Sequence, residues 1–239
     1  MSARHPVTSL ANSYLNTFTE LLHSCKPEKA IAKFSKLVSG KQLDTMSANA
    51  LFYVTHNASA ENLKEDLISK ACQAKLQLDN CAKSLSNFAL RKLRGKAVVV
   101  HPLDSFSASV LQSASSVRFI QANQGILHLL PVHKLESHNA LTAHAAMAGA
   151  DMVLLEPTAV SDMGVFTASG GRLLAELAKA RDIPVYALAT SWHTAPNRPA
   201  QQGEERVPQD LITGIISEQG IFSHEEFLDR VQKAFPWML

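Results

Sequence analysis

The segment from Asp151 to His193, DMVLLEPTAVSDMGVFTASGGRLLAELAKARDIPVYALATSWH, constrains the fold more than any other part of the chain. It predicts an apolar strand over Met152 to Leu155 and a loop of small and turn-forming residues. A helix from about Arg172 and a second apolar strand over Val185 to Ala189 follow. Parallel strands joined by a crossover helix form a βαβ unit. Open α/β sheets bind ligands at the carboxyl ends of such strands, so this loop is the first candidate for a binding site.

Three glycines of the loop, Gly164, Gly170 and Gly171, allow positive φ angles or the close approach of a ligand to the backbone. The Gly170-Gly171 pair precedes the predicted helix, whose free N–H groups suit an anion such as a phosphate. Alternatively, the pair only makes a tight turn. The spacing matches neither the dinucleotide motif G-x-G-x-x-G nor the P-loop, so neither kind of nucleotide site is supported.

Apolar periodicity divides the chain into two parts. The first ~95 residues carry apolar residues at helical spacing and almost no strand signal, and they predict two short helices over Ser13 to Cys25 and Lys29 to Leu37 and a long amphipathic helix after Ser59. The remainder alternates short apolar runs with helical stretches. We therefore predict an N-terminal helical domain over residues 1–95 and a second domain over residues 96–239.

The second domain is predicted to be α/β, with a doubly wound parallel sheet, because strand and helix patterns alternate through it. Ala97 to Val100 form an apolar run typical of a strand buried on both faces. Val207 to Phe222 predict a further helix or a strand pair that closes the sheet, and Ser223 with Glu226 predicts the start of a last helix. Further strands are expected over residues 117–120 and 125–130, and helices from about residue 107 and over residues 140–148.

Composition excludes several classes of function. A formal net charge of +2 and the lack of a basic run with interleaved aromatic residues give no reason to expect nucleic-acid binding. No apolar run reaches the ~18 residues that a membrane span needs, and the N-terminus lacks the apolar region of a secretory signal. We expect a cytoplasmic protein without a membrane partner.

Neither cysteine nor histidine spacing predicts a metal site. The three cysteines, Cys25, Cys72 and Cys81, lack C-x-x-C spacing and are expected to be free thiols. The ten histidines are scattered and do not form the H-E-x-x-H pattern. We therefore predict no metal and no cofactor.

Three separated segments carry motifs of one protein family. The stretch from Leu103 to Leu111 looks like I-L-T-H-x-x-S-x-x-V-L. The stretch from Glu156 to Arg172, continued by Ile183 to Tyr186, looks like a strand-and-loop motif that ends in N-K-I-G-T and is followed by I-P-(V/F)-Y-V. The stretch from Pro208 to Ile221 matches P-x-x-L-I-T-x-I-I-T-E-x-G-V. With these motifs the chain resembles the alpha, beta and delta regulatory subunits of eukaryotic translation initiation factor 2B. It also resembles their relatives, the ribose-1,5-bisphosphate isomerases and methylthioribose-1-phosphate isomerases.

The resemblance covers most of the chain after Lys96, and the N-terminal domain is similar in kind. It implies a helical domain followed by a Rossmann-like domain, a homodimer or assembly with related subunits, and a link to translation initiation. The isomerases of the family use a cysteine and an aspartate, and these positions fall on Ser105 and Thr158. Hydroxyl groups transfer protons poorly near neutral pH. The family's Asn-Lys falls on Ala168-Ser169, which removes an ammonium group that could meet a phosphate.

The favoured hypothesis is a non-catalytic protein of this kind that binds a phosphorylated metabolite, either a sugar phosphate or a nucleoside monophosphate, or binds partner subunits. Helix N–H groups at Gly170 and Gly171 and the charge of Arg172 would supply the anion site. The predicted ligand-binding residues are Ser105, Thr158, Gly164, Ser169, Gly170, Gly171, Arg172 and His193.

The alternative hypothesis is an aldose-ketose isomerase, an intramolecular oxidoreductase acting on a phosphosugar with substitute catalytic residues. Its catalytic candidates are Asp104, Ser105 and Asp162, with His101 and His193 on neighbouring loops, because a histidine with an aspartate can act as an acid-base pair near neutral pH. A simpler interpretation makes the two aspartates turn or cap residues and lets His101 end a strand. The apolar C-terminal tail fits either a dimer interface or packing on its own domain.

Overall fold

The structure is a computed structural model that describes residues 9–39, 43–56, 58, 59, 61–103, 105–120 and 135–238. It divides into two compact units, Met1–Ala82 and Lys83–Leu239. Helix α4 (Leu63–Leu93) runs through the division. The domain boundary near Gly95 stays a prediction.

The first unit is helical, as its periodicity predicted. It contains α1 (Ser9–Ser24), α2 (Pro27–Val38), α3 (Thr45–His56) and the first part of α4. The ring of Phe34 in α2 packs 5.0 Å from that of Phe18 in α1. Helix α3 was not predicted, because its sequence TMSANALFYVTH lacks a regular apolar stripe and mixes polar with β-branched residues.

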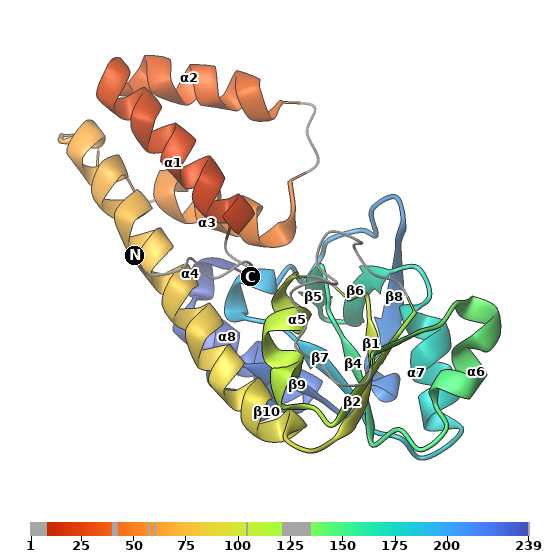
Figure 1. Cartoon of the computed structure of the whole chain (residues 1–239). Coiled ribbons are helices and arrows are strands. Elements are labelled where there is room, and N and C mark those ends of the chain that lie inside the picture. The colour runs from red at the N-terminus through yellow and green to blue at the C-terminus, as the bar shows by residue number, and fades with distance from the viewer. Residues whose placement is uncertain are drawn as a thin grey trace. The chain divides into compact units, whose positions relative to one another are not determined.

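The second unit is built on a seven-stranded sheet of the order β10-β9-β7-β4-β1-β2-β3 (Figure 1). All neighbouring strands are parallel except β9 and β10. The parallel strands therefore follow the doubly wound Rossmann order, which reverses between β1 and β4. The strands are β1 (Ala97–His101), β2 (Ser116–Phe119), β3 (Leu135–Ser137), β4 (Met152–Leu155), β7 (Val185–Leu188), β9 (Gly214–Ser217) and β10 (Gly220–Phe222).

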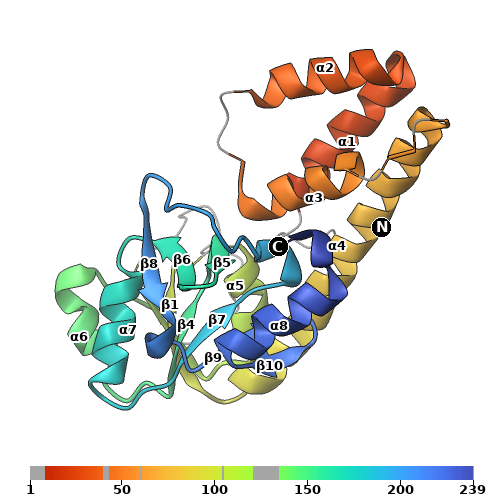
Figure 2. The same cartoon turned by 180° about the vertical axis from the view of Figure 1, so that it is seen from behind.

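Helices cover the sheet on both sides, with α6 and α7 on one side and α5 and α8 on the other (Figures 1 and 2). The predicted parallel α/β sheet is confirmed. The helices are α5 (Ser105–Val110), α6 (Ala143–Ala146), α7 (Gly171–Lys179) and α8 (His224–Ala234), and the 3₁₀ turns are η2 (Leu111–Ser113), η4 (Ala140–Thr142), η5 (Ser191–His193), η6 (Gln209–Leu211) and η7 (Pro236–Met238). The strand expected over residues 125–130 lies outside the described residues. No helix of the described part has both the length and the apolar character to span a membrane.

A second sheet replaces the loop that the sequence predicted after β4. Strands β5 (Ala159–Ser161) and β6 (Gly164–Ala168) form a hairpin, and β8 (Glu204–Pro208) joins β6 antiparallel. The prediction of a loop here was wrong. A hairpin this short is stable only with a third strand, and β8 lies about forty residues further along the chain, where no local pattern connects it to the hairpin.

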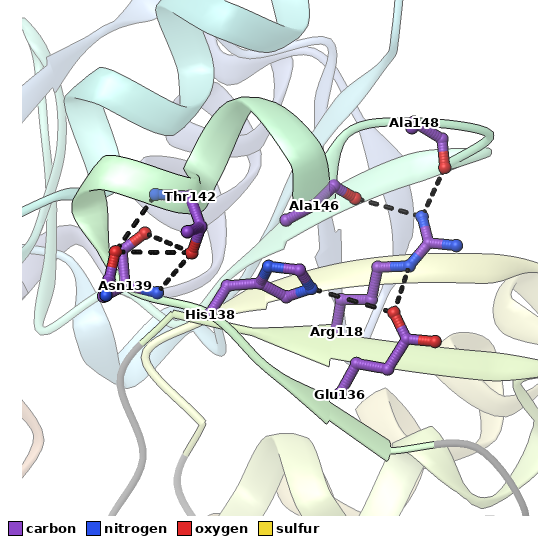
Figure 3. A network of polar contacts seen from close by, with 7 residues as sticks. All are labelled: Arg118, Glu136, His138, Asn139, Thr142, Ala146 and Ala148. Carbon is purple, nitrogen blue, oxygen red and sulfur yellow. Dashed lines mark hydrogen bonds and ion pairs between the residues drawn. The ribbon is translucent and has the colours of Figure 1, made fainter.

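Arg118 of strand β2 forms hydrogen bonds at the end of α6 (Figure 3). Its Nη1 group donates to the backbone carbonyls of Ala146, at 3.0 Å, and Ala148, at 2.5 Å, and its Nε donates to Glu136 in β3 at 3.3 Å. A guanidinium suits helix carbonyls that lack a partner within the helix. Arg118 therefore stabilises the edge of the sheet through an element that is far from it in sequence.

The C-terminal tail packs on its own unit. The buried ring of Trp192 lies 6.3 Å from the ring of Phe235 and 5.7 Å from that of Trp237. Of the two alternatives for this tail, the structure shows packing within the unit.

Candidate functional site

The reversal of strand order between β1 and β4 marks the crevice where a doubly wound sheet binds ligands. His101 ends β1 beside Leu155, the last residue of β4. The next residue, Glu156, donates its backbone N–H to the carbonyl of His101 at 3.0 Å. An imidazole and a carboxylate thus belong to adjacent strand ends at this crevice.

His101 is completely buried, and its Nε2 lies 3.1 Å from the backbone carbonyl of Ala168. Burial lowers the pKa of His101, an effect that the hydrogen bonds to Ala168 and Ser169 and the charge of Glu205 only partly offset. The carbonyl can only accept, so Nε2 carries the proton of a neutral ring. Within the described residues, Nδ1 is buried without a hydrogen-bond partner.

The pKa of His101 predicts a pH-dependent stability. Its value in the folded protein lies below the ordinary 6.5, so the unfolded chain binds more protons between the two values. The stability contributed by neutral His101 is present above about pH 6.5 and is lost as the pH falls through the folded pKa. Urea unfolding, followed by tryptophan fluorescence between pH 7.5 and 5, should show a smaller acid loss in His101→Gln than in the wild type. Equal losses in both proteins would contradict the prediction.

The amino terminus of α7 already holds a carboxylate. Gly170 begins it with φ at +109°, and Glu205 of β8 accepts the N–H groups of Gly170 at 2.6 Å and Arg172 at 2.8 Å through Oε1. Glu205 satisfies free N–H groups and complements the helix dipole. The sequence predicted a phosphate at this place, and a phosphate that used these two N–H groups would have to displace Glu205.

Close packing explains the second glycine of the pair. A Cβ on Gly171 would lie 2.3 Å from Cγ2 of Thr167 and 3.4 Å from the ring of His101. Ser169, beside the pair, donates its hydroxyl to the carbonyl of Gly203 at 3.2 Å. The helix terminus is therefore seated directly on His101.

Thr158, where the sequence resemblance placed the isomerases' aspartate, lies beside a carboxylate from another strand. Its hydroxyl is 3.3 Å from the carbonyl of Phe166 and also bonds the carboxylate of Glu204 in β8. Glu204 forms a 2.9 Å ion pair with Arg198, and the two side chains are only 9% and 12% exposed. Burial raises the pKa of Glu204, but the bonds from Arg198, Thr158 and the N–H of Gln201 outweigh it and hold the pKa below 4.5.

Two carboxylates at this edge were missed from the sequence. Glu204 is paired with Ala168 across β6 and β8, and this long-range register leaves no local signal. Glu156 directly follows a buried strand, which is a signal that could have been used. Its Oε2 accepts the N–H of Ser107 at 3.2 Å, in the first turn of α5.

His193 lies beyond the carboxyl end of β7 and is almost completely buried. The backbone N–H of Thr190 donates to its Nδ1 at 3.0 Å, so Nδ1 is an acceptor and any proton of the neutral ring sits on Nε2. Glu218, which follows β9, accepts the N–H of Ser191 at 3.2 Å and its hydroxyl. Both side chains thus hold the turn η5 in place.

Asp162 and Gly164 lie away from the other predicted site residues. Asp162 is exposed in the turn between β5 and β6, four residues beyond Thr158, which corresponds to about 13 Å along a strand. Asp104 falls outside the described residues, and Ser105 is the first residue of α5. The structure therefore brings His101, Gly170 and Gly171 together and places the hairpin turn elsewhere. The described part of the chain contains no group of three or more potential metal ligands.

Two kinds of protein are among the solved structures that share this fold. Translation initiation factor eIF-2B of Pyrococcus horikoshii OT3 superposes with a TM-score of 0.75 at 16% identity, covering 93% of each chain. A chain of the tetrameric eIF2B-beta2-delta2 complex of Chaetomium thermophilum gives a TM-score of 0.73 at 14% identity, covering 94% of this chain and 88% of that one. The 5-methylthioribose 1-phosphate isomerase of P. horikoshii OT3 gives 0.70 at 12% identity, covering 98% and 85%.

No family model and no curated protein matches the sequence. At such low identity the similarity shows the fold. The likeness to initiation factor 2B subunits and methylthioribose-1-phosphate isomerases that the three motifs predicted is thus confirmed at the level of the structure.

Proposed function

We propose that this protein is a non-catalytic relative of the initiation factor 2B subunits, which binds a phosphorylated metabolite at the crevice between β1 and β4 and assembles with a like or related subunit. The metabolite is a sugar phosphate or a nucleoside monophosphate. The similar solved structures support both the metabolite binding and the assembly. One is an isomerase of a sugar phosphate, and another is a chain of a tetramer built from two kinds of subunit.

The observation that carries the proposal is how the acid-base groups near the crevice are bound. General acid-base catalysis works best with a pKa near the working pH and a proton position facing the substrate. His101 donates a hydrogen bond from Nε2 to a backbone carbonyl, and Arg198 keeps Glu204 ionised. Glu156 holds the first turn of α5. These groups stabilise the strand ends and are poorly placed to move protons on a sugar.

Three measurements test the proposal. Calorimetry with sugar phosphates and nucleoside monophosphates should give a binding heat, and light scattering should give a mass above that of one chain. Isomerisation assays with ribose-1,5-bisphosphate and methylthioribose-1-phosphate should give no turnover above the rate without protein. Asp162→Asn is the matched control for binding, because its exposed turn position predicts an unchanged affinity. Turnover by the wild type would overturn the non-catalytic part.

One observation favours the isomerase as the second candidate. Glu204 supplies a carboxylate beside Thr158, where the isomerases are expected to carry aspartate. If Glu204 replaced that aspartate, turnover would be present in the wild type and lost in Glu204→Gln while the tryptophan fluorescence of the folded protein persisted. It would be unchanged in Asp162→Asn.

A further inference from the structure

A hollow of about 390 Å³ lies against the small sheet and the first turn of α7. Three arginines, Arg172, Arg198 and Arg206, line it together with Phe166, Met163 and Glu205. We call it the arginine hollow. Its volume falls within the range of small-molecule sites.

The floor and one wall of the arginine hollow come from the sheet. Phe166 of β6 is directly opposite Arg206 of β8, so the two side chains share a face. Arg198, in the segment before β8, lies over the ring of Phe166 with its guanidinium carbon 5.6 Å from the ring centre. This contact and the ion pair to Glu204 hold Arg198 in one position.

Among the described residues, two of the three arginines of the arginine hollow already pair with carboxylates, Arg172 with Glu176 at 2.8 Å and Arg198 with Glu204 at 2.9 Å, and Arg206 does not. Glu205 directs Oε1 to the N–H groups of Gly170 and Arg172. Arg206 contacts the sulfur of Met163 at 3.1 Å and forms no ion pair with the described residues. Arg198 pairs through Nη2, whereas its Nη1 is buried without a hydrogen-bond partner in the described part of the chain. A buried N–H donor of this kind is costly unless another group accepts from it.

We propose that the arginine hollow is a binding site for a small phosphomonoester, separate from the crevice at the ends of β1 and β4. The guanidinium fork of Arg206 binds the phosphate, and Arg198 and Arg172, each paired with a glutamate, add N–H donors from the sides. Planar guanidinium groups fit phosphate oxygens in pairs of hydrogen bonds, and a dianion can satisfy more than one fork. The exposed side chain of Met163 offers an apolar surface to the rest of the ligand.

Arg206→Gln tests the site, with glucose 6-phosphate as the probe and calorimetry at low salt as the readout. Loss of one guanidinium to phosphate should weaken binding about tenfold or more. Arg206→Lys keeps the charge without the fork and should recover part of the affinity. Since Arg206 is exposed and, among the described residues, its side chain bonds only to the sulfur of Met163, both variants should fold, which thermal unfolding checks.

Control variants distinguish binding at the arginine hollow from non-specific attraction to positive charge and from binding at the crevice. Arg230→Gln removes an exposed arginine of α8 that pairs with Glu226, and it should leave the affinity unchanged. Glucose should give no heat. Wild-type affinity in Arg206→Gln, or an equal loss in Arg230→Gln, would overturn the inference. Loss in Thr158→Val together with full binding in Arg206→Gln would place the phosphate in the crevice, so the proposed function would stand while the arginine hollow failed.

Discussion

Gly164→Ala should lower the free energy of unfolding of the Lys83–Leu239 unit by about 3–5 kcal/mol. Gly164 has φ at +133°, a conformation that residues with a side chain rarely adopt. A Cβ built there lies 2.2 Å from the backbone carbonyl oxygen of Val207. Because both atoms belong to a paired β ladder, neither can move without breaking the small sheet. Urea unfolding followed by the fluorescence of Trp192 and Trp237 measures the loss.

Gly149→Ala is the matched control for Gly164. Its φ is +68°, and no atom lies within 4 Å of the Cβ position, so it should cost about 1–2 kcal/mol through backbone conformation alone. The difference between the variants isolates the clash with Val207. Equal losses of unfolding free energy in the two variants would show that the hairpin shifts to make room for the Cβ atom. A variant at position 164 with unchanged stability but no ligand binding would instead support the role predicted from the sequence.

Arg198→Met should lower the same free energy by about 2–4 kcal/mol. The substitution keeps an apolar side chain over Phe166 but leaves the carboxylate of Glu204 buried without its ion-pair partner. The double variant Arg198→Met with Glu204→Met should recover much of the loss, because an uncompensated charge costs more than a missing pair. The coupling energy from the double-mutant cycle is therefore the quantity to measure.

Acid titration gives an independent check on this ion pair. Since the pKa of Glu204 lies below 4.5 in the folded protein, its stabilisation is present above that value and lost as the pH falls through the folded pKa. Arg198→Met should flatten this part of the acid unfolding curve. Lys233→Met is the control, because Lys233 and Asp229 are 74% and 55% exposed and their pair should contribute far less. Similar losses in the two variants would contradict the assignment of a buried pair.

Local patterns in the sequence predicted strands β1, β2, β4 and β7 of the main sheet, whereas strand β3 was not predicted. The apolar runs at 97–100 and 152–155 became β1 and β4, because a strand buried on both faces must be apolar throughout. Gly170 and Gly171 begin α7, and Ser223 caps α8 by accepting the N–H of Glu226 at 3.2 Å. These signals lie within a few residues of the structures that they specify.

Only part of the predicted anion site could be predicted from the sequence. The glycine pair does start a helix at the carboxyl edge of the sheet, as predicted from turn chemistry. Glu205 accepts the N–H groups at the start of α7 only because β8 pairs with β6. No periodicity near Gly170 encodes a carboxylate 35 residues away.

The sequence by itself determined the fold class and the alternation of strands and helices. The tertiary structure alone decided which polar and charged groups meet: Glu204 with Thr158 and Arg198, and Glu205 with the start of α7. The physical reason is the separation of the interacting residues along the sequence. Strand and helix formation reflect burial patterns between close neighbours in sequence, whereas each of these contacts joins residues through strand β8 or the segment before it, whose position is set by backbone pairing.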